Sequence, residues 1–194
     1  GPGVTGQELN AALLETGLAF PTAHCGMVPL GGFLLGGGLG LNGNGWGGFS
    51  TFNIRAARVV TADGEIRHAS ESENPELLWA VRGGGPGLFG VVTGFTLDAY
   101  PAPRAILSNQ WTFRFSDIET VVEAFAAVAP RIDRNVELLA YVGPAETPPA
   151  GGDPVDQRLA VYLNANVYAV GDTTPARIQP LAEHAIVRRA YRRH

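Results

Sequence analysis

Glycine is the residue type whose spacing in this sequence most directly suggests chemistry. Two stretches match the pattern G-x-G-x-x-G, at residues 38–43 and 85–90, and residues 31–40 mix glycine with large apolar side chains. Backbone that carries no side chains lets a phosphate or a flat ligand approach main-chain N–H groups closely. Tight turns inside a compact core are the alternative interpretation. The glycines therefore predict either a ligand cradle or a set of turns.

Neither G-x-G-x-x-G match predicts a dinucleotide-binding fingerprint. That fingerprint needs a strand before it and a helix N-terminus after it, because the helix end carries the pyrophosphate. The first match runs on into Asn44-Gly45-Trp46-Gly47-Gly48, which does not begin a helix. The second is followed by Val91-Val92-Thr93, a strand pattern. The sequence therefore argues against a Rossmann domain.

Composition excludes several classes of function. The chain has 194 residues, of which 45% are hydrophobic and 16% charged, so it can bury a core. All 14 basic residues are arginine, which excludes Schiff-base and P-loop lysines. A net charge of −4 argues against nucleic acid as a partner. The apolar runs are too short to span a bilayer and no signal peptide is visible, so we expect no membrane partner and a cytoplasmic location.

Cysteine and metal-ligand patterns are sparse. Cys25 is the single cysteine and cannot form an internal disulfide. The sequence has no G-x-S-x-G elbow, no H-E-x-x-H and no Cys/His spacing typical of zinc, so we predict no metal site.

The first hundred residues predict elements around the glycines. Thr5 and Glu8 fit a capping box that opens a helix, and Gly17 fits its end. Asp63-Gly64 predicts a hairpin turn. The further expected elements are strands 55–62 and 65–69, a helix opened by Asn74-Pro75-Glu76 with Asn74 as N-cap, and a buried strand 88–97.

A change of composition at Tyr100-Pro101-Ala102-Pro103 predicts a domain boundary, giving domains 1–103 and 104–194. Ser116 and Glu119 repeat the capping-box pattern before a helix that ends at Pro130. Strands are expected at 109–115, 136–142 and 158–168, with a loop at 143–156. Helices and strands in this irregular order predict an α+β fold.

The strand at 158–168 alternates between an apolar and a polar side. Tyr141 on the neighbouring strand, with Gln110 and Arg114 on the first, could share the polar side. That side is either a solvated sheet face or a ligand-contacting one. The candidate substrate-face residues are Tyr141, Tyr162, Asn164 and Asn166.

Four motifs together resemble one family, the FAD-linked oxidases of the vanillyl-alcohol oxidase type, and within it the berberine-bridge-enzyme-like oxidoreductases. They occur in the family's order over about the first hundred residues, which makes the match specific. The motifs are Cys25-Gly26-Met27-Val28 through Gly31-Gly32 to Gly36-Gly37-Gly38, then 59–64, then 73–85, and finally Phe89-Gly90-Val91-Val92-Thr93.

The resemblance implies the second half of an FAD-binding domain over residues 1–103 and part of an antiparallel-sheet substrate domain over 104–194. It also implies that the N-terminal flavin subdomain and the C-terminal end of the family lie outside this sequence. Cys25 matches the cysteine that forms a thioether to the flavin in bicovalent members, although Gly26 and Phe33 depart from their Pro and His. A small buried hydrophobe is the alternative for Cys25. The cofactor-binding residues implied are Cys25, Val28, Gly31, Gly32, Gly36, Gly37, Gly38, Gly90, Val91 and Val92.

The implied function is a flavin-dependent oxidoreductase whose substrate is a small alcohol, sugar or amine. A hydride passes from this substrate to FAD, with oxygen as the acceptor. In the family, a sheet like the one expected here roofs the flavin and lines the substrate site. Two alternatives stay open: a truncated, non-catalytic scaffold, and a sugar- or small-ligand-binding module that holds no FAD.

Overall fold

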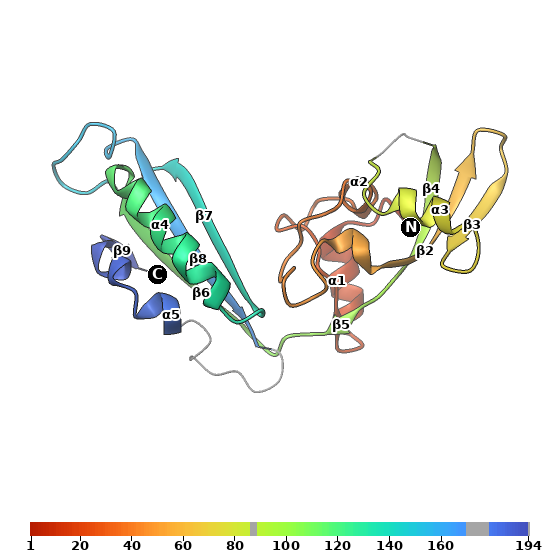
Figure 1. Cartoon of the computed structure of the whole chain (residues 1–194), viewed down its shortest axis with the longest axis horizontal. Coiled ribbons are helices and arrows are strands. Elements are labelled where there is room, and N and C mark those ends of the chain that lie inside the picture. The colour runs from red at the N-terminus through yellow and green to blue at the C-terminus, as the bar shows by residue number, and fades with distance from the viewer. Residues whose placement is uncertain (86–88, 170–178, 194) are drawn as a thin grey trace. The chain divides into compact units, whose positions relative to one another are not determined.

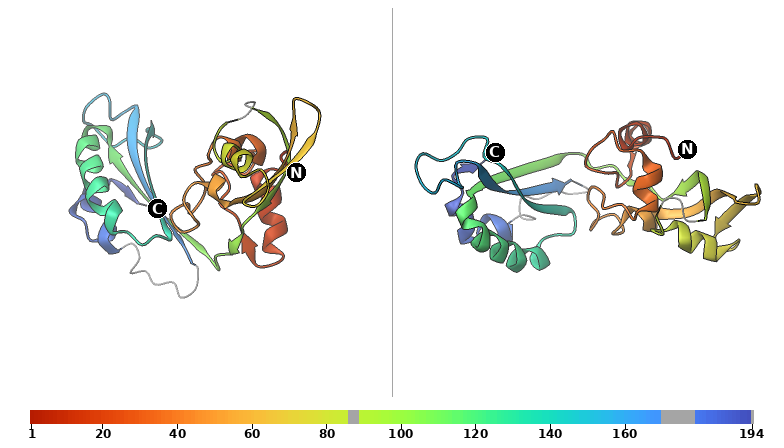
Figure 2. Two further views of the ribbon diagram at one scale, coloured as in Figure 1. Left: turned by 45° about the vertical axis from the view of Figure 1, so that its right-hand side comes forward. Right: turned by 90° about the horizontal axis from the view of Figure 1, so that it is seen from above.

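The computed structural model describes residues 1–85, 89–169 and 179–193, and it divides into two compact units, Gly1–Ala102 and Pro103–His194 (Figures 1 and 2). Residues 86–88, which include the middle of the second G-x-G-x-x-G match and the expected start of the strand at residue 88, lie outside the described residues. Both units combine helices with antiparallel sheets, so the predicted α+β class is confirmed.

Unit 1 contains a three-stranded antiparallel sheet and a two-stranded ladder. The ladder pairs the first strand with the last, and the amide of Ala102 donates to the carbonyl of Gly17 at 2.9 Å beside it. The elements are α1 Gly6–Leu14, β1 Leu18–Ala19, α2 Leu30–Leu35, the 3-10 turn η1 Ser50–Asn53, β2 Ile54–Thr61, β3 Ile66–Ser70, α3 Pro75–Val81, β4 Gly90–Leu97 and β5 Tyr100–Pro101.

The sheet of unit 1 has the order β3-β2-β4, and the predicted hairpin around Asp63-Gly64 is confirmed. The core lies on one face of this sheet, beneath the helices (Figure 1). β4 is an edge strand with one open face, so the prediction of a buried strand is wrong: Val92 is buried, whereas Val91 is 67% exposed. The buried cluster comprises Phe20, Leu30, Leu34, Ile54, Ala57, Val59, Ala69, Leu78, Val81 and Val92.

The helix starts of unit 1 only partly follow their sequence signals. At α1 the capping box forms, with Thr5 N donating to a Glu8 carboxylate oxygen at 2.9 Å and Glu8 N donating to the Thr5 hydroxyl at 3.3 Å. At α3, Asn74 precedes the first helical residue but makes no side-chain cap. Its side-chain amide instead donates to the carbonyl of His68 at 2.7 Å, which ties the helix start to β3.

Unit 2 is a four-stranded antiparallel sheet of order β7-β8-β6-β9. The strands begin or end within a few residues of the predicted bounds. The elements are β6 Ile106–Arg114, the 3-10 turn η2 Phe115–Asp117, α4 Ile118–Val128, the 3-10 turn η3 Ala129–Arg131, β7 Val136–Pro144, β8 Leu159–Tyr168, α5 Gln179–Ala182, the 3-10 turn η5 Ala185–Arg189 and β9 Arg192–Arg193.

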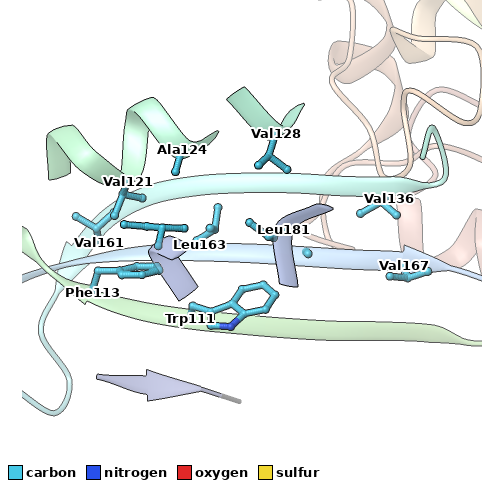
Figure 3. Packing of buried hydrophobic residues seen from close by; sticks show 12 residues of the cluster. Trp111, Phe113, Val121, Ala124, Val128, Val136, Val161, Leu163, Val167 and Leu181 are labelled. Atoms are coloured by element: carbon cyan, nitrogen blue, oxygen red, sulfur yellow. The ribbon is translucent and has the colours of Figure 1, made fainter. Parts of the chain in front are cut away.

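Helix α4 covers one face of this sheet (Figure 2). Val121, Ala124 and Val128 of the helix pack onto Trp111 and the apolar side of β8 (Figure 3). The alternation predicted for β8 is confirmed, because its odd-numbered residues from 161 to 167 are buried in this core. The opposite, polar side therefore faces away from α4.

The second capping box does not form. Ser116 lies in η2, and α4 begins two residues later with no side-chain cap from Asp117. The amide and hydroxyl of Ser116 donate instead to the two carboxylate oxygens of Asp156, at 2.9 and 3.0 Å. Asp156 is only 2% exposed, so a residue at the end of the 143–156 loop replaces the local cap.

Candidate cofactor and substrate sites

The turn that carries Cys25 is held by the first turn of α1. The amide of Gly6 donates to the carbonyl of Val28 at 3.1 Å, and the amide of Gln7 donates to the carbonyl of Gly26 at 2.8 Å. The amides at a helix start have no partner within the helix, so these bonds satisfy two of them. The position of residues 25–28 is thus set by main-chain bonds and does not depend on their side chains.

Cys25 and its neighbour His24 are exposed on this turn. The alternative interpretation of Cys25 as a small buried hydrophobe is therefore wrong. Met27 is 69% exposed beside it. An accessible thiol can act as a nucleophile through its thiolate.

Residues 30–35 form a short helix, α2, which the glycine pattern does not predict. Leu30 and Leu34, four residues apart, are 4% and 0% exposed and enter the core. Gly32 and Gly36 have the same spacing on another side of the helix and are exposed. A Cβ added at Gly32 would meet no atom within 4 Å, and its φ is not left-handed. The described chain therefore does not require glycine at this position, and the helix offers a strip of bare backbone.

The strip continues into a turn that packs against η1. Gly37 has a φ of +103°, a conformation that side chains rarely adopt. The amide of Ser50 donates to the carbonyl of Gly38 at 2.7 Å, and that of Thr51 donates to Gly37 at 3.0 Å. The amide of Gly85 donates to Leu35 at 2.7 Å. These bonds bring three separate segments of the chain to one glycine-rich surface.

Two buried polar side chains follow the strip in this glycine-rich segment. Asn42 is 1% exposed and Thr51 is 2% exposed. Within the described residues, the side-chain amide nitrogen and oxygen of Asn42 have no hydrogen-bond partner, and the Thr51 hydroxyl also has none. Buried polar groups are almost always hydrogen-bonded. Bare backbone beside orphaned polar atoms fits a polar, flat cofactor such as FAD. Sequence reasoning missed both residues, because nothing in their local pattern marks them as buried.

Gly90, Val91 and Val92 lie in β4, the edge strand of the unit 1 sheet. Because β4 pairs with β2 on one side only, part of its main-chain N–H and C=O groups point away from the sheet. This geometry leaves main-chain groups available to a ligand. Gly31 differs from these residues, since a Cβ there would lie 3.0 Å from Pro2 Cβ and its amide already donates to Pro2.

In unit 2 the pairing of the strands places residues of the predicted polar face next to one another. Tyr141 lies opposite Tyr162, and Gln110 lies opposite Asn164. The rings of Tyr141 and Tyr162 stack with centroids 5.0 Å apart at 17°. Tyr141 is 47% exposed, whereas Tyr162 is 6% exposed. One face of the Tyr141 ring therefore packs against Tyr162, while the side chain remains partly exposed.

Hydrogen bonding separates these candidates into two groups. The hydroxyl of Tyr162 donates to the carbonyl of Pro144 at 2.6 Å, and the amide of Asn166 donates to the carboxylate of Glu137 at 3.2 Å. Glu137 also accepts from the hydroxyl of Tyr168 at 3.2 Å. The carbonyl oxygen of the Asn164 side chain is buried and has no partner among the described residues. The polar groups of Tyr162 and Asn166 are thus used in hydrogen bonds within the fold, whereas the side-chain carbonyl oxygen of Asn164 is not.

The described residues 1–85, 89–169 and 179–193 contain no group of three or more His, Cys, Asp or Glu residues placed to hold a metal ion. They also contain no helix with the length and apolar character needed to cross a membrane.

Comparison with known proteins places the glycine-rich segment in a family. Residues 1–70 match the model of the FAD binding domain. The chain is 36% identical over 138 residues to the FAD-linked oxidoreductase ptmO of Penicillium ochrochloron, an alignment that covers 71% of this chain and 30% of that protein. The chain thus spans about a third of the length of the relatives it matches.

Solved structures agree with this match. The xylooligosaccharide oxidase from Myceliophthora thermophila C1, in complex with xylobiose, aligns over 100% of this chain and 39% of its own, with a TM-score of 0.75 and 26% identity. The BBE-like 1 protein of Physcomitrella patens aligns over 100% of this chain and 38% of its own, with a TM-score of 0.80 and 21% identity, which supports the fold. The expected fold, the expected FAD cofactor and the expected resemblance to FAD-linked oxidases are confirmed: residues 1–70 match the FAD binding domain, and the chain is similar over most of its length to FAD-linked oxidoreductases.

Proposed function

We propose that this chain supplies part of the FAD-binding domain (residues 1–103) and part of the substrate domain (residues 104–194) of a flavin-dependent oxidoreductase. The parent protein would oxidise a small alcohol, sugar or amine, with oxygen as the final acceptor. FAD, when bound, supplies the hydride-accepting chemistry. The observation that carries the proposal is the exposed backbone at Gly32, where an added Cβ would meet no atom of the described chain within 4 Å, so that no contact there accounts for the missing side chain.

In this proposal the glycine-rich segment holds the cofactor through its backbone. Gly32, Gly36, Gly37 and Gly38 let it approach closely, and Val28 belongs to the adjoining turn fixed by α1. Asn42 and Thr51 would give their unused polar atoms to the cofactor or to water beside it. Gly90, Val91 and Val92 would contribute main-chain groups from the edge of the sheet. Gly31 has a packing role against Pro2 and would contribute indirectly.

Cys25 would bond covalently to the flavin ring. The thiolate of Cys25 would be the nucleophile, and FAD, when bound, would supply the electrophilic ring. Exposure of the thiol is the observation in favour of this step.

The polar face of unit 2 would contact the substrate through two kinds of residue. Tyr141 offers a half-exposed ring for stacking, and Asn164 offers an amide for hydrogen bonding. Tyr162 and Asn166 would position them, since their own polar groups are already bonded.

The proposal is tested by titrating FAD into the purified chain and following flavin fluorescence and visible absorbance. Saturable quenching is the expected result. A flavin band that stays with acid-precipitated protein, and is lost in Cys25→Ser, would establish the covalent bond. A band released by acid would keep FAD binding and remove the covalent role of Cys25. Absence of any saturable signal from the folded chain would contradict cofactor binding by this segment.

The two alternatives receive less support. The FAD binding domain match covers the glycine-rich segment itself, which does not favour a scaffold or a sugar-binding module without FAD.

A further inference from the structure

The arginines of unit 1 differ in their partners. Of the four, Arg55 pairs with Asp98 at 2.5 Å and Arg67 pairs with Asp63 at 2.7 Å. The Nε of Arg82 donates to the carbonyl of Ile54 at 2.9 Å, and its Nη2 lies 3.9 Å from Glu71. Within the described residues, Arg58 has no carboxylate within 4 Å and bonds only to a neutral side chain, Thr93. It therefore carries an uncompensated charge on the open face of the sheet.

The Arg58 side chain is nonetheless fixed in place. Its Nε donates to the hydroxyl of Thr93 at 3.0 Å, and this hydroxyl lies 3.2 Å from the carbonyl of Arg58, to which it donates. The two bonds cross from β2 to β4 at a bulge in their pairing. Because Nε is used as the anchor, both terminal NH₂ groups of the guanidinium remain available. An anchored guanidinium loses less freedom on binding than a mobile one.

Small residues leave a shallow hollow of about 280 Å³ around this guanidinium. Gly94 lies opposite Arg58 on β4, and His68 lies opposite it on β3. A Cβ on Gly94 would already be 3.9 Å from Nη2, so a longer side chain would compete for the space. Ala56 and Thr96 also line the hollow. Its donors are thus the guanidinium, the imidazole of His68 and the hydroxyl of Thr96.

We infer that this hollow is a binding site for an oxyanion, a carboxylate or a phosphate group. A planar guanidinium with two free NH₂ groups binds two oxygens of one anion in parallel, and charge-assisted hydrogen bonds of this kind are the stronger ones. His68 and Thr96 would complete the site with one further donor each. The site lies on the sheet face opposite the core and is separate from the glycine-rich segment.

The test follows the Nε–H signal of Arg58 and the amide signals of Thr93 and Gly94 by NMR while inorganic phosphate, acetate or chloride is added at constant ionic strength. We expect saturable shifts with phosphate or acetate and none with chloride. Arg58→Gln should weaken the affinity at least about tenfold, the size expected for a lost charge-assisted bond. Arg67→Gln is the matched control, since it removes a paired arginine from the neighbouring strand and should leave the shifts unchanged.

FAD and riboflavin separate the possible sources of the anion. If FAD shifts the Arg58 signal and riboflavin does not, the oxyanion is the cofactor's pyrophosphate; if neither does while acetate or phosphate saturates, the anion is another molecule. Equal, unsaturated shifts with all three salts would reflect screening only and overturn the inference. Saturation that persists in Arg58→Gln would also overturn it.

Discussion

Replacing Gly32 by leucine should raise stability and lower FAD affinity at the same time. Gly32 lies inside α2 with an ordinary φ and open space where its Cβ would stand. Glycine is the poorest helix former after proline and leucine one of the best, so the substitution should raise the free energy of unfolding by about 0.5–1 kcal/mol. Few glycines in a binding segment allow such a gain, because most have a left-handed φ or a close neighbour.

The same side chain would stand on the strip where we propose that FAD lies. Forcing extra methylene groups into a filled space costs about 1–3 kcal/mol, so the Kd for FAD should rise about 5- to 150-fold. Urea unfolding followed by tryptophan fluorescence measures the first quantity, and quenching of flavin fluorescence measures the second.

Gly3→Leu is the matched control. Gly3 also has no atom within 4 Å of an added Cβ, but it lies outside helix α2. This variant should bind FAD as the unsubstituted chain does. Unchanged FAD affinity in Gly32→Leu would refute the cradle. Loss of stability would refute the open environment on which the cradle rests.

Three further outcomes follow from the described contacts. Asp156→Ala should lower the free energy of unfolding by about 1–3 kcal/mol, measured in urea, because it leaves two Ser116 donors without their buried acceptor. Leu163→Ala, at a fully buried site in the unit 2 core, should lower it by about 2–5 kcal/mol, while Val142→Ala at a 44% exposed site should have a much smaller effect. The Thr61 hydroxyl, followed by Arg67, lowers the pKa of Asp63 from 3.8 to about 2. Because the folded-state pKa lies below the ordinary value, the stabilisation is fully present above about pH 4 and is lost as the pH falls through about 2. An NMR titration of Asp63 with a pKa near 3.8 would contradict this assignment.

Local signals predicted elements well where no distant residue competed with them. The capping-box pattern occurs twice, and it forms at Thr5, where Glu8 is the nearest partner. At Ser116 the same pattern fails, because Asp156 occupies both donors from 40 positions along the chain. The alternation along β8 correctly gave the core side and the polar side, since each strand has only two faces.

The candidate sites were less accessible to such reasoning. The motifs located the glycine-rich segment, but not its helix, because a glycine pattern alone does not distinguish a turn from a helix with one bare side. The exposure of Cys25 and the burial of Asn42 depend on how α1 and η1 pack beside them. Tyr162 and Asn166 donate hydrogen bonds to Pro144 and Glu137, which lie on another strand. The sequence pattern therefore did not distinguish these two residues from the other two substrate-face candidates.

The β1–β5 ladder affects how unit 1 must assemble and where it can be cut. It joins Leu18 to Pro101, and closing a loop of this length costs about 4 kcal/mol of chain entropy. The β7–β8 pair closes across a much shorter connection, at about 2 kcal/mol. Sheet formation in unit 2 can therefore begin locally, whereas unit 1 completes its ladder only after residue 101 is available. A separately expressed unit 1 that stopped before Tyr100 would leave β1 with an unpaired edge, so its shortest complete form ends after Ala102, whose amide bonds to Gly17.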